Sequence, residues 1–389
     1  MEFDEVKEGT SIAVIGVGGG GGNAVNTMIE KSLSGVEFMV ANTDSTDLRK
    51  SKAKIKIQLG KKTCNGLGTG SLPDKGESSA KESEEEIKSQ LKDIDILFIA
   101  AGLGGGTGTG ASPIIASIAK KMEILTIGVV SLPFENEGKK RKENAAQGVR
   151  KFKENVDTLL VFENEKLNSN FSDLLFLDAY TKADEILYNA IKAISDVINK
   201  TGHMNLDTAD IIQVTSNKGY ALIGIGESEG ENRAATAAKN AITNPLLDTV
   251  ALETCNAILV NITAGQDLKM SEVQEIMDLI ENETGKDKNI FKGIIIDNEM
   301  EKKISVTAIA TGLDNEIEEK LALFPENKKK KAEHDKELKE AQERIDLQSS
   351  YTKRVKNNQN PPPRTRNPKK KYKNIPEKEV PVFLKQLTN

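Results

Sequence analysis

The sequence predicts an α/β protein with a Rossmann-like parallel-sheet domain, a long central helix, a second and smaller α/β domain, and a disordered C-terminal linker. Three observations lead to this prediction. In the first part of the chain, short apolar runs alternate with glycine-rich or helical sequence. One long amphipathic stretch follows, and a lysine-rich segment with few large apolar residues comes near the C-terminus. Alternating strands and helices are typical of βαβ units, whose parallel strands are covered on both faces.

Short apolar runs are the expected strands of both domains. Those of the first domain are 12–17, 36–41, 94–101, 124–130 and 158–162, and those of the second are 220–226, 258–263, 294–296 and 304–310. Between the two sets, the stretch from Asp173 to Asn199 carries apolar residues at every third or fourth position, among them Leu187, Ile191 and Ile194. This period predicts one long helix.

The C-terminal linker is predicted from its charge. Between Pro325 and Ile375 there are 16 Lys or Arg against 7 Asp or Glu, a net charge of +9 in a chain whose total is −5. Such a segment buries too little apolar surface to offset the entropy of ordering it. The expected parts are a first domain at 1–172, the central helix with the start of the following loop at 173–204, a second domain at 205–315, the linker at 316–376, and a terminal peptide at 377–389.

Composition excludes several classes of protein. The chain of 389 residues has 37% hydrophobic and 29% charged residues, an ordinary globular balance. No apolar run approaches the roughly 18 residues that span a bilayer, and no secretory signal is visible. The net charge argues against nucleic-acid binding. Two cysteines exclude a disulfide framework, and two histidines exclude a multi-His metal site. We therefore expect a cytoplasmic protein with no membrane span and no nucleic-acid partner.

Two glycine-rich segments follow predicted strands and precede predicted helices. The first runs from Gly16 to Asn23 (GVGGGGGN) and the second from Gly102 to Gly110 (GLGGGTGTG). Glycines at a helix start let backbone N–H groups approach a phosphate, and the helix dipole favours the anion. Two such segments at the ends of parallel strands suit a polyphosphate held from both sides. Thr107 and Thr109 could donate hydroxyls to its terminal groups.

The first segment alone leaves other interpretations open. It satisfies the GxGxxG pattern of nicotinamide-binding domains, so a dinucleotide-dependent oxidoreductase is the competing enzyme class. It could also be no more than a tight turn. The second segment favours a polyphosphate, because a dinucleotide fold has no need of it. The phosphate-loop motif GxxxxGK[ST] does not occur in the sequence, which argues against a Ras-like switch or an ordinary P-loop ATPase.

Together, GGGGGN at 18–23 and GGGTGTG at 104–110 resemble the glycine loops of the tubulin/FtsZ family, most closely those of its bacterial cell-division members. The resemblance extends over nearly the whole chain up to Gly312. It implies a GTPase that binds GTP or GDP with Mg²⁺ and polymerises head to tail into protofilaments, with hydrolysis coupled to polymerisation. Such filaments would form the cytokinetic ring at midcell in a bacterial cytoplasm. A GTP-binding, plasmid-positioning scaffold with little hydrolysis is the alternative, and a requirement for K⁺ stays open.

The resemblance also assigns nucleotide contacts to individual residues. Phosphate contacts are assigned to Gly19, Gly20, Gly21, Gly22, Gly106, Thr107 and Gly108. Contacts to the ribose and the adjoining phosphates are assigned to Asn42, Asp44, Glu137 and Arg141. Contacts beside the guanine are assigned to Asn23, Asn164, Tyr180 and Asp184.

The chemistry of these residue types agrees with their assigned roles. Tyr180 and Asp184 are four positions apart, so a helix places them on one face. The ring can stack on a purine, and the carboxylate can accept hydrogen bonds from guanine N1–H and the 2-amino group, a donor pair that adenine lacks. Without the resemblance, a core tyrosine and a surface aspartate would be the simpler interpretation. Arg141 is a fixed cation suited to phosphate, although its Lys/Arg-rich surroundings equally suit a solvated charge.

The segment after the central helix supplies the expected catalytic residues, Asn205, Asp207 and Asp210. A helix of about 27 residues is roughly 40 Å long, so within one molecule this segment lies far from the phosphates. The resemblance implies that the loop of one subunit enters the nucleotide site of the next, which generates an open filament. Hydrolysis would then depend on positioning and charge stabilisation. Acidic residues at a helix start are also common caps. Thr208 stands where the family usually has Phe.

The C-terminal residues become apolar again. The segment from Val380 to Gln386 (VPVFLKQ) resembles the short peptide through which family members engage membrane tethers and division regulators. Val380, Phe383 and Leu387 form an apolar stripe that a groove can hold. For an unmatched sequence, a frayed terminus would be the ordinary expectation. The other departures from the family pattern are Thr69 for Ala, Tyr180 for Phe, and Glu185 where Asn or Asp is usual.

Overall fold

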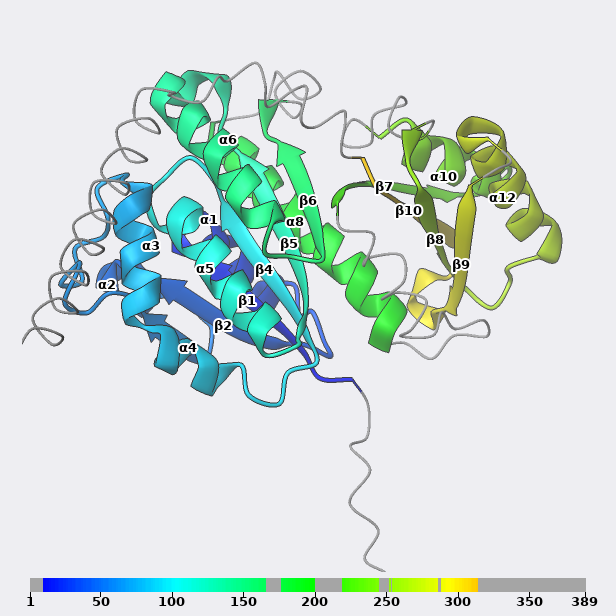
Figure 1. Cartoon of the computed structure of the whole chain (residues 1–389). Helices are drawn as coiled ribbons and strands as arrows, with labels where there is room; N and C mark the ends of the chain where they lie inside the picture. The colour runs from blue at the N-terminus through cyan, green and yellow to red at the C-terminus, as the bar shows by residue number, and fades with distance from the viewer. Residues whose placement is uncertain are drawn as a thin grey trace, which may run out of the picture. The chain divides into compact units, whose positions relative to one another are not determined.

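A computed structural model of the chain describes residues 10–165, 176–199, 219–244, 252, 254–285 and 288–313. All of these residues belong to one unit of the chain, Met1–Glu326 (Figure 1). The expected linker and terminal peptide lie outside the described residues. The same holds for the expected catalytic residues Asn205, Asp207 and Asp210.

The N-terminal strands form a parallel arrangement in the order β3-β2-β1-β4-β5-β6. Their bounds are β1 (Ile12–Val17), β2 (Glu37–Asn42), β3 (Ile55–Gln58), β4 (Ile96–Gly102), β5 (Leu125–Leu132) and β6 (Thr158–Glu163). All positions of β1 are buried. Parallel strands covered on both faces are expected to be continuously apolar rather than alternating, and the sequence of β1 follows that rule.

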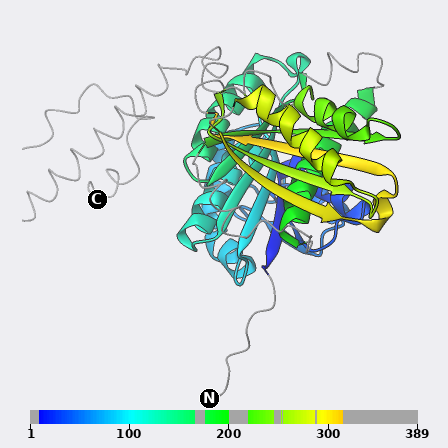
Figure 2. The same cartoon turned by 90° about the vertical axis from the view of Figure 1, so that its right-hand side faces the viewer.

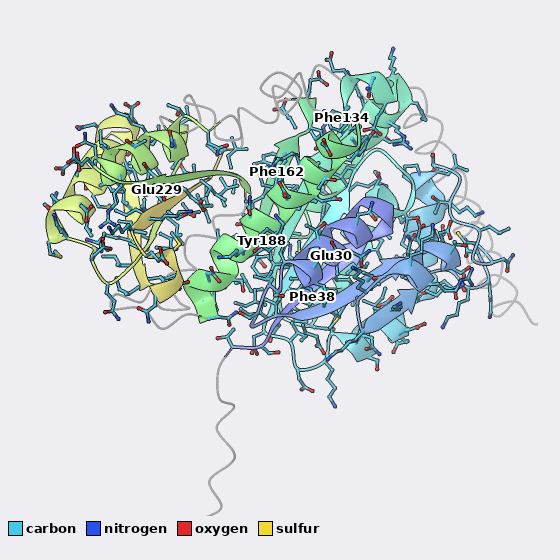
Figure 3. The ribbon with its side chains drawn as sticks, turned by 180° about the vertical axis from the view of Figure 1, so that it is seen from behind. Glu30, Phe38, Phe134, Phe162, Tyr188 and Glu229 are labelled. Atoms are coloured by element: carbon cyan, nitrogen blue, oxygen red, sulfur yellow. The ribbon has the colours of Figure 1, made fainter. Side chains whose placement is uncertain are left out.

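Helices cover both faces of these strands. Alternate residues of β1 enter different apolar clusters, Ala13 and Ile15 one of them, Ile12 and Val14 the other. The first cluster contains side chains from α3 (Pro73–Glu82), α4 (Glu84–Gln90), α5 (Thr107–Lys121) and α6 (Lys139–Lys153). The second contains side chains from α1 (Gly18–Glu30), α2 (Ser45–Lys50) and α8 (Phe176–Asn199), and Figure 3 labels two of its members, Phe162 of β6 and Tyr188 of α8.

The strand order changes direction between β1 and β4. From β1 the chain continues outward through β2 to β3, whereas β4 lies on the other side of β1 and is followed outward by β5 and β6. Such a switch point leaves a crevice at the carboxyl ends of the two central strands. Since β1 ends at Val17 and β4 at Gly102, both glycine-rich segments begin at this crevice.

The C-terminal part has a mixed sheet in the order β7-β10-β8-β9 (Figure 2). Its elements are β7 (Gly219–Glu229), α10 (Arg233–Ile242), β8 (Ala257–Ala264), α12 (Met270–Thr284), β9 (Asn289–Ile296) and β10 (Lys303–Thr311). Strand β10 is antiparallel to β7 and β8, whereas β8 and β9 are parallel. Three parallel residue pairs, from Thr158↔Gly219 to Leu160↔Ala221, join β6 to β7, so hydrogen bonding is continuous through ten strands.

The expected α/β fold is confirmed, with differences in particular elements. The sequence interpretation missed β3, and β9 begins at Asn289 rather than at 294. Short helical turns, η1 (Glu135–Glu137) and η2 (Asn298–Met300), also occur. The expectation that the glycine runs form loops ahead of their helices is partly wrong, because α1 starts at Gly18 and α5 at Thr107. Within the ranges described above, no helix has both the length and the apolar composition for crossing a bilayer.

Candidate functional site

The two glycine-rich segments contact each other through their backbones. Gly18 has a φ of +73°, and a Cβ added to it would lie 2.8 Å from the backbone nitrogen of Gly108. A Cβ on Gly20 would lie 3.3 Å from the Cα of Gly102. Neither contact leaves room for a larger residue without displacement of the backbone. The structure therefore brings together the two segments that the sequence assigned to phosphate binding.

The glycines of these segments differ in what surrounds them. A Cβ on Gly22 or Gly105 would meet nothing within 4 Å, and one on Gly19 would meet only Asp47 Oδ2 at 3.7 Å. By contrast, a Cβ on Gly21 would lie 2.2 Å from the carbonyl oxygen of Ala100. A phosphate needs open space over backbone N–H groups, such as the space at Gly19, Gly22 and Gly105. At Gly21 a glycine is instead required by close packing.

The helices that start at the crevice, α1 after Val17 and α5 after Gly106, have no capping side chain and no acidic residue of their own in the first turn. The nearby α2 is capped instead, because the carboxylate of Asp44 accepts hydrogen bonds from Thr46 N at 2.7 Å and from Asp47 N at 3.4 Å. The first N–H groups of α1 and α5 have no intrahelical partners, and with the helix dipoles they favour an anion.

The two threonines of the second segment are both buried. The hydroxyls of Thr107 and Thr43 lie 2.6 Å apart, which links the end of β2 to the start of α5. Thr109 is 2% exposed, and its hydroxyl accepts a hydrogen bond from Gly104 N at 2.8 Å. Its burial and its hydrogen bond with Gly104 N give Thr109 a role in holding the backbone of its own segment, and contact with a terminal phosphate stays a prediction.

A cavity of about 130 Å³ opens between the start of α1 and the end of β2. It brings together four of the predicted residues, Gly19, Gly22, Asn23 and Asn42. Asn42 accepts a hydrogen bond from Asp44 N at 3.2 Å and donates one to Asp47 Oδ2 at 3.4 Å. The backbone of Asp44 therefore helps to hold the side chain of Asn42 in the lining of the cavity. The unpredicted members of the lining are Gly18, Asn26, Val40, Asp47, Leu48, Lys50 and Ser51.

Another group of predicted residues surrounds Phe134, which the sequence interpretation missed. Glu137 accepts a hydrogen bond from Phe134 N at 2.9 Å, and its other oxygen pairs with the guanidinium of Arg141. The ring of Tyr180 meets the ring of Phe134 edge to face, with centroids 5.2 Å apart; Figure 3 labels Phe134 beside the start of α8. Partial burial, with the charge of Glu137, raises the pKa of Tyr180. A lone aromatic residue in the polar segment after β5 is the signal that could have indicated Phe134.

Asp184 is partly buried on α8, one turn after Tyr180. Burial raises the pKa of its carboxyl to about 7. The neighbouring Glu185 differs, because hydrogen bonds from Lys182 and Lys31 lower its pKa. A carboxyl with so perturbed a pKa is a candidate for ligand binding, although Asp184 does not line the cavity at the start of α1. Asn164, which follows β6 directly, is 7% exposed.

Comparison with known proteins identifies the family. The model of the tubulin/FtsZ family GTPase domain matches residues 11–172, and the model of the FtsZ family C-terminal domain matches residues 219–314. An empty FtsZ dimer from M. jannaschii has 40% sequence identity to this chain and a TM-score of 0.73, over 78% of this chain and 88% of that one. The chain belongs to the tubulin/FtsZ family.

Two CetZ structures share the fold at lower identity. CetZ2 from Haloferax volcanii, as a GTPγS-bound protofilament, has a TM-score of 0.72 at 20% identity, over 83% of this chain and 100% of that one. CetZ1 from the same organism, as a GDP-bound monomer, has a TM-score of 0.69 at 22% identity, over 79% and 95%. Family membership supports a GTP-binding domain and excludes the oxidoreductase alternative. These relatives are archaeal, so the expected bacterial source stays a prediction.

Metal binding was expected only together with the nucleotide. Among the residues that the structure describes, no three or more His, Cys, Asp or Glu side chains are grouped so that they could hold a metal ion. The open glycines at the crevice nevertheless fit a triphosphate, and Mg²⁺ is commonly held by substrate phosphates with few protein ligands. The Mg²⁺ assignment therefore depends on GTP binding.

Proposed function

We propose that this protein hydrolyses GTP and assembles head to tail into protofilaments that form the scaffold of the cell-division ring in a bacterial cytoplasm. One observation carries the proposal. Two glycine-rich segments meet at the strand switch point of a tubulin/FtsZ GTPase domain, and both adjoining helix starts lack a capping side chain and an acidic residue. Such an arrangement suits the phosphates of a nucleotide, because helix starts at a switch point favour anions.

The nucleotide would extend from the glycines to the start of α8. Phosphates would bind at Gly19–Gly22 and Gly106–Gly108, and Mg²⁺, when bound, would neutralise part of their charge. The ribose side would meet Arg141 and Glu137, whose ion pair in the free protein presents a ready cation and acceptor. Asn23, Asn164, Tyr180 and Asp184 would surround the guanine.

Asp184 is the residue that would select guanine over adenine. Its ionised carboxylate would accept hydrogen bonds from N1–H and the 2-amino group. Hydrogen bonds to the charged form lower a pKa, so binding would ionise a carboxyl that is only partly ionised at neutral pH in the free protein. Tyr180, braced by Phe134, would provide the stacking surface.

Hydrolysis would require a second subunit. Helix α8 extends for 24 residues, about 36 Å, away from the base-reading end, and the segment with Asn205, Asp207 and Asp210 follows it in the sequence. These residues would act on GTP held by the neighbouring subunit. A contact of this head-to-tail kind does not close on itself and generates a filament. The terminal peptide at 377–389 would recruit membrane tethers and division regulators.

Light scattering tests the proposal most directly. The purified full-length protein is mixed with Mg²⁺ and either GTP, GDP or a non-hydrolysable GTP analogue, and phosphate release is followed in parallel. We expect scattering with GTP and the analogue only, and phosphate release that begins above a threshold protein concentration. Assembly without phosphate release would favour the non-hydrolysing scaffold. Failure to bind any guanine nucleotide would refute the proposal.

A further inference from the structure

The backbone of the second glycine-rich segment is held from both sides at Gly104. This residue has a φ of +107°, a conformation that residues with a side chain rarely adopt. Its N–H donates a hydrogen bond to Thr109 Oγ1 at 2.8 Å, and its carbonyl oxygen accepts one from Asn144 Nδ2 at 3.2 Å. Thr109 is 2% and Asn144 3% exposed. Two buried side chains thus fix one residue at the beginning of the segment.

The amide of Asn144 also holds a neighbouring loop. Asn144 Nδ2 donates to the carbonyl oxygen of Ser71 at 3.4 Å, so both protons of the amide group can be used. In the same loop, Thr69 covers the glycine segment closely, because a Cβ added to Gly106 would lie 2.0 Å from Thr69 Oγ1. Asn144 therefore joins the loop around Thr69 to the glycine segment.

Helix α6 is shaped for this contact. Asn144 and Gly148 are four residues apart and share a face of the helix. A Cβ on Gly148 would lie 2.6 Å from Thr109 Cγ2, so a glycine there lets α6 approach the first turn of α5. The predicted ligand Arg141 lies one turn before Asn144, and its carbonyl oxygen would be 3.0 Å from a Cβ on Gly104.

We propose that Asn144 is a positioning residue for phosphate binding. By holding the Gly104 carbonyl, it fixes the direction in which the N–H groups of Gly105–Gly108 point before the ligand arrives. Donors that are already oriented need no reordering when the anion binds, so they bind it more tightly. This inference rests on the proposed function of the site as a GTP site. It predicts an effect that increases with the number of phosphates.

The test compares GTP, GDP and GMP, measured by displacement of a fluorescent guanine nucleotide from the full-length protein. Asn144→Ala removes the amide, and Asn144→Leu removes it while keeping the volume filled. We expect both to bind GTP about tenfold more weakly, GDP less so, and GMP within twofold of the wild type. The control is Asn155→Ala, which removes a side-chain hydrogen bond to the Lys151 carbonyl at 2.8 Å; this bond is exposed and lies at the other end of α6.

Several outcomes would overturn the proposal. An equal loss for all three nucleotides would indicate a general structural role, and a loss in the alanine variant alone would indicate a cavity effect. Unchanged GTP affinity in both variants would exclude the role altogether. If neither variant folds, Thr109→Val keeps the packing against Gly148 and removes only the acceptor for Gly104 N, and it should give the same graded loss. Wild-type protein that binds none of the nucleotides would refute the proposed function itself.

Discussion

Helices α1 and α5, which begin at the crevice, differ from α10 and α12 of the C-terminal part in the charged side chains at their starts. In the N-terminal part, α1 and α5 begin with glycine or threonine and have neither a side-chain cap nor an early acidic residue. In the C-terminal part, α10 also has neither a side-chain cap nor an early acidic residue, but its first residue, Arg233, is buried and paired. The start of α12 is capped by Glu272, which accepts a hydrogen bond from Lys269 N at 2.8 Å. A paired charged side chain therefore lies at the start of each of these two helices, whereas the starts of α1 and α5 carry none.

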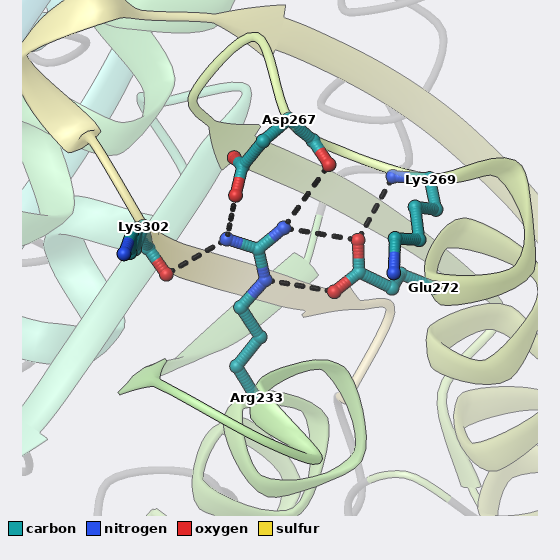
Figure 4. Close-up of polar contacts among 5 residues, drawn as sticks. All are labelled: Arg233, Asp267, Lys269, Glu272 and Lys302. Carbon is teal, nitrogen blue, oxygen red and sulfur yellow. Dashed lines mark hydrogen bonds and ion pairs between the residues drawn. The ribbon is translucent and has the colours of Figure 1, made fainter.

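Arg233 shows how thoroughly the C-terminal part is paired (Figure 4). Its guanidinium donates to both carboxylate oxygens of Glu272 at 2.7 and 3.0 Å, to Asp267 Oδ2 at 2.8 Å, and to the carbonyl of Lys302 at 2.8 Å. The hydrogen bonds from Arg233 lower the pKa of Glu272. In the C-terminal part the charged side chains at the helix starts are thus bound within the protein, where they support the fold.

The largest expected effect tests the support role. Arg233→Ala should lower the free energy of unfolding by about 3 kcal/mol, because it leaves two carboxylates without their buried cation. Arg233→Lys should recover only part of this, since an ammonium cannot bind Glu272 through two parallel hydrogen bonds. Urea unfolding measures the loss, and GTP affinity under native conditions should stay within twofold. A loss below 1 kcal/mol would show that the hydrogen bonds of Arg233 to Asp267 and Glu272 contribute little to stability.

The next prediction concerns Asp210, in the segment that follows α8 in the sequence, and its role in GTP hydrolysis. Asp210→Ala should keep near-normal GTP affinity but hydrolyse GTP about 10²-fold more slowly, as expected for a residue that positions the attacking water. Thr107→Arg should block the phosphate site while keeping an intact aspartate loop. Each variant alone should be nearly inactive, and a mixture should regain GTPase activity above the assembly threshold. Co-assembly seen by electron microscopy without regained activity would contradict a shared site.

Two glycines of α1 separate the roles of packing and binding. Gly22→Ala places a methyl group in open space, so we expect GTP affinity to fall at least tenfold while stability is unchanged or rises by up to about 1 kcal/mol. Gly18→Ala should instead lower stability by about 1–2 kcal/mol, because of its positive φ and its contact with Gly108. Thermal unfolding and nucleotide titration together distinguish them. Equal behaviour of the two variants would contradict the division into open and packed glycines.

The smallest effect is a pH dependence at Asp184. A carboxyl with a raised pKa holds more protons in the folded than in the unfolded chain, so its contribution to stability is present at low pH and is lost as pH rises through about 7. Guanine binding needs the ionised form, so GTP affinity should weaken by up to about tenfold between pH 7.5 and pH 6. The Asp184→Asn variant has a side chain that does not titrate, so its GTP affinity should not show this change between pH 7.5 and pH 6. A parallel pH profile in both proteins would exclude Asp184 as the cause.

The sequence predicted those elements whose pattern is strong. The continuous apolar run of β1 and the helical period around Ile191 specify their structure locally, and the structure confirms both. Strand β3 (Ile55–Gln58) was missed because it has only four residues, too few for its alternating polarity to stand out as a strand pattern. The helical starts at Gly18 and Thr107 were missed because glycine disfavours helix, and tertiary packing overrides that preference here.

At the candidate site, the sequence indicated residue types but not their mutual contacts. Glu137 and Arg141 are one helical turn apart, so their pairing could have been anticipated. The contact of Phe134 with Tyr180 could not, because the two residues come from different elements that only the fold brings together. The raised pKa of Asp184 depends on burial, and burial is a property of the folded protein. The assigned nucleotide contacts themselves stay predictions.

The close contact between the glycine segments has a consequence for how this sequence would evolve. If a descendant lost its nucleotide, selection would no longer preserve Gly22 or Gly105, whose surroundings tolerate a side chain. Gly16, Gly18 and Gly21 would persist, because added Cβ atoms would lie within 2.8 Å of neighbouring atoms. A descendant that no longer binds a nucleotide would therefore keep only the closely packed glycines. The loss of Gly22 and Gly105 alone would show that ligand binding was lost while the fold was kept.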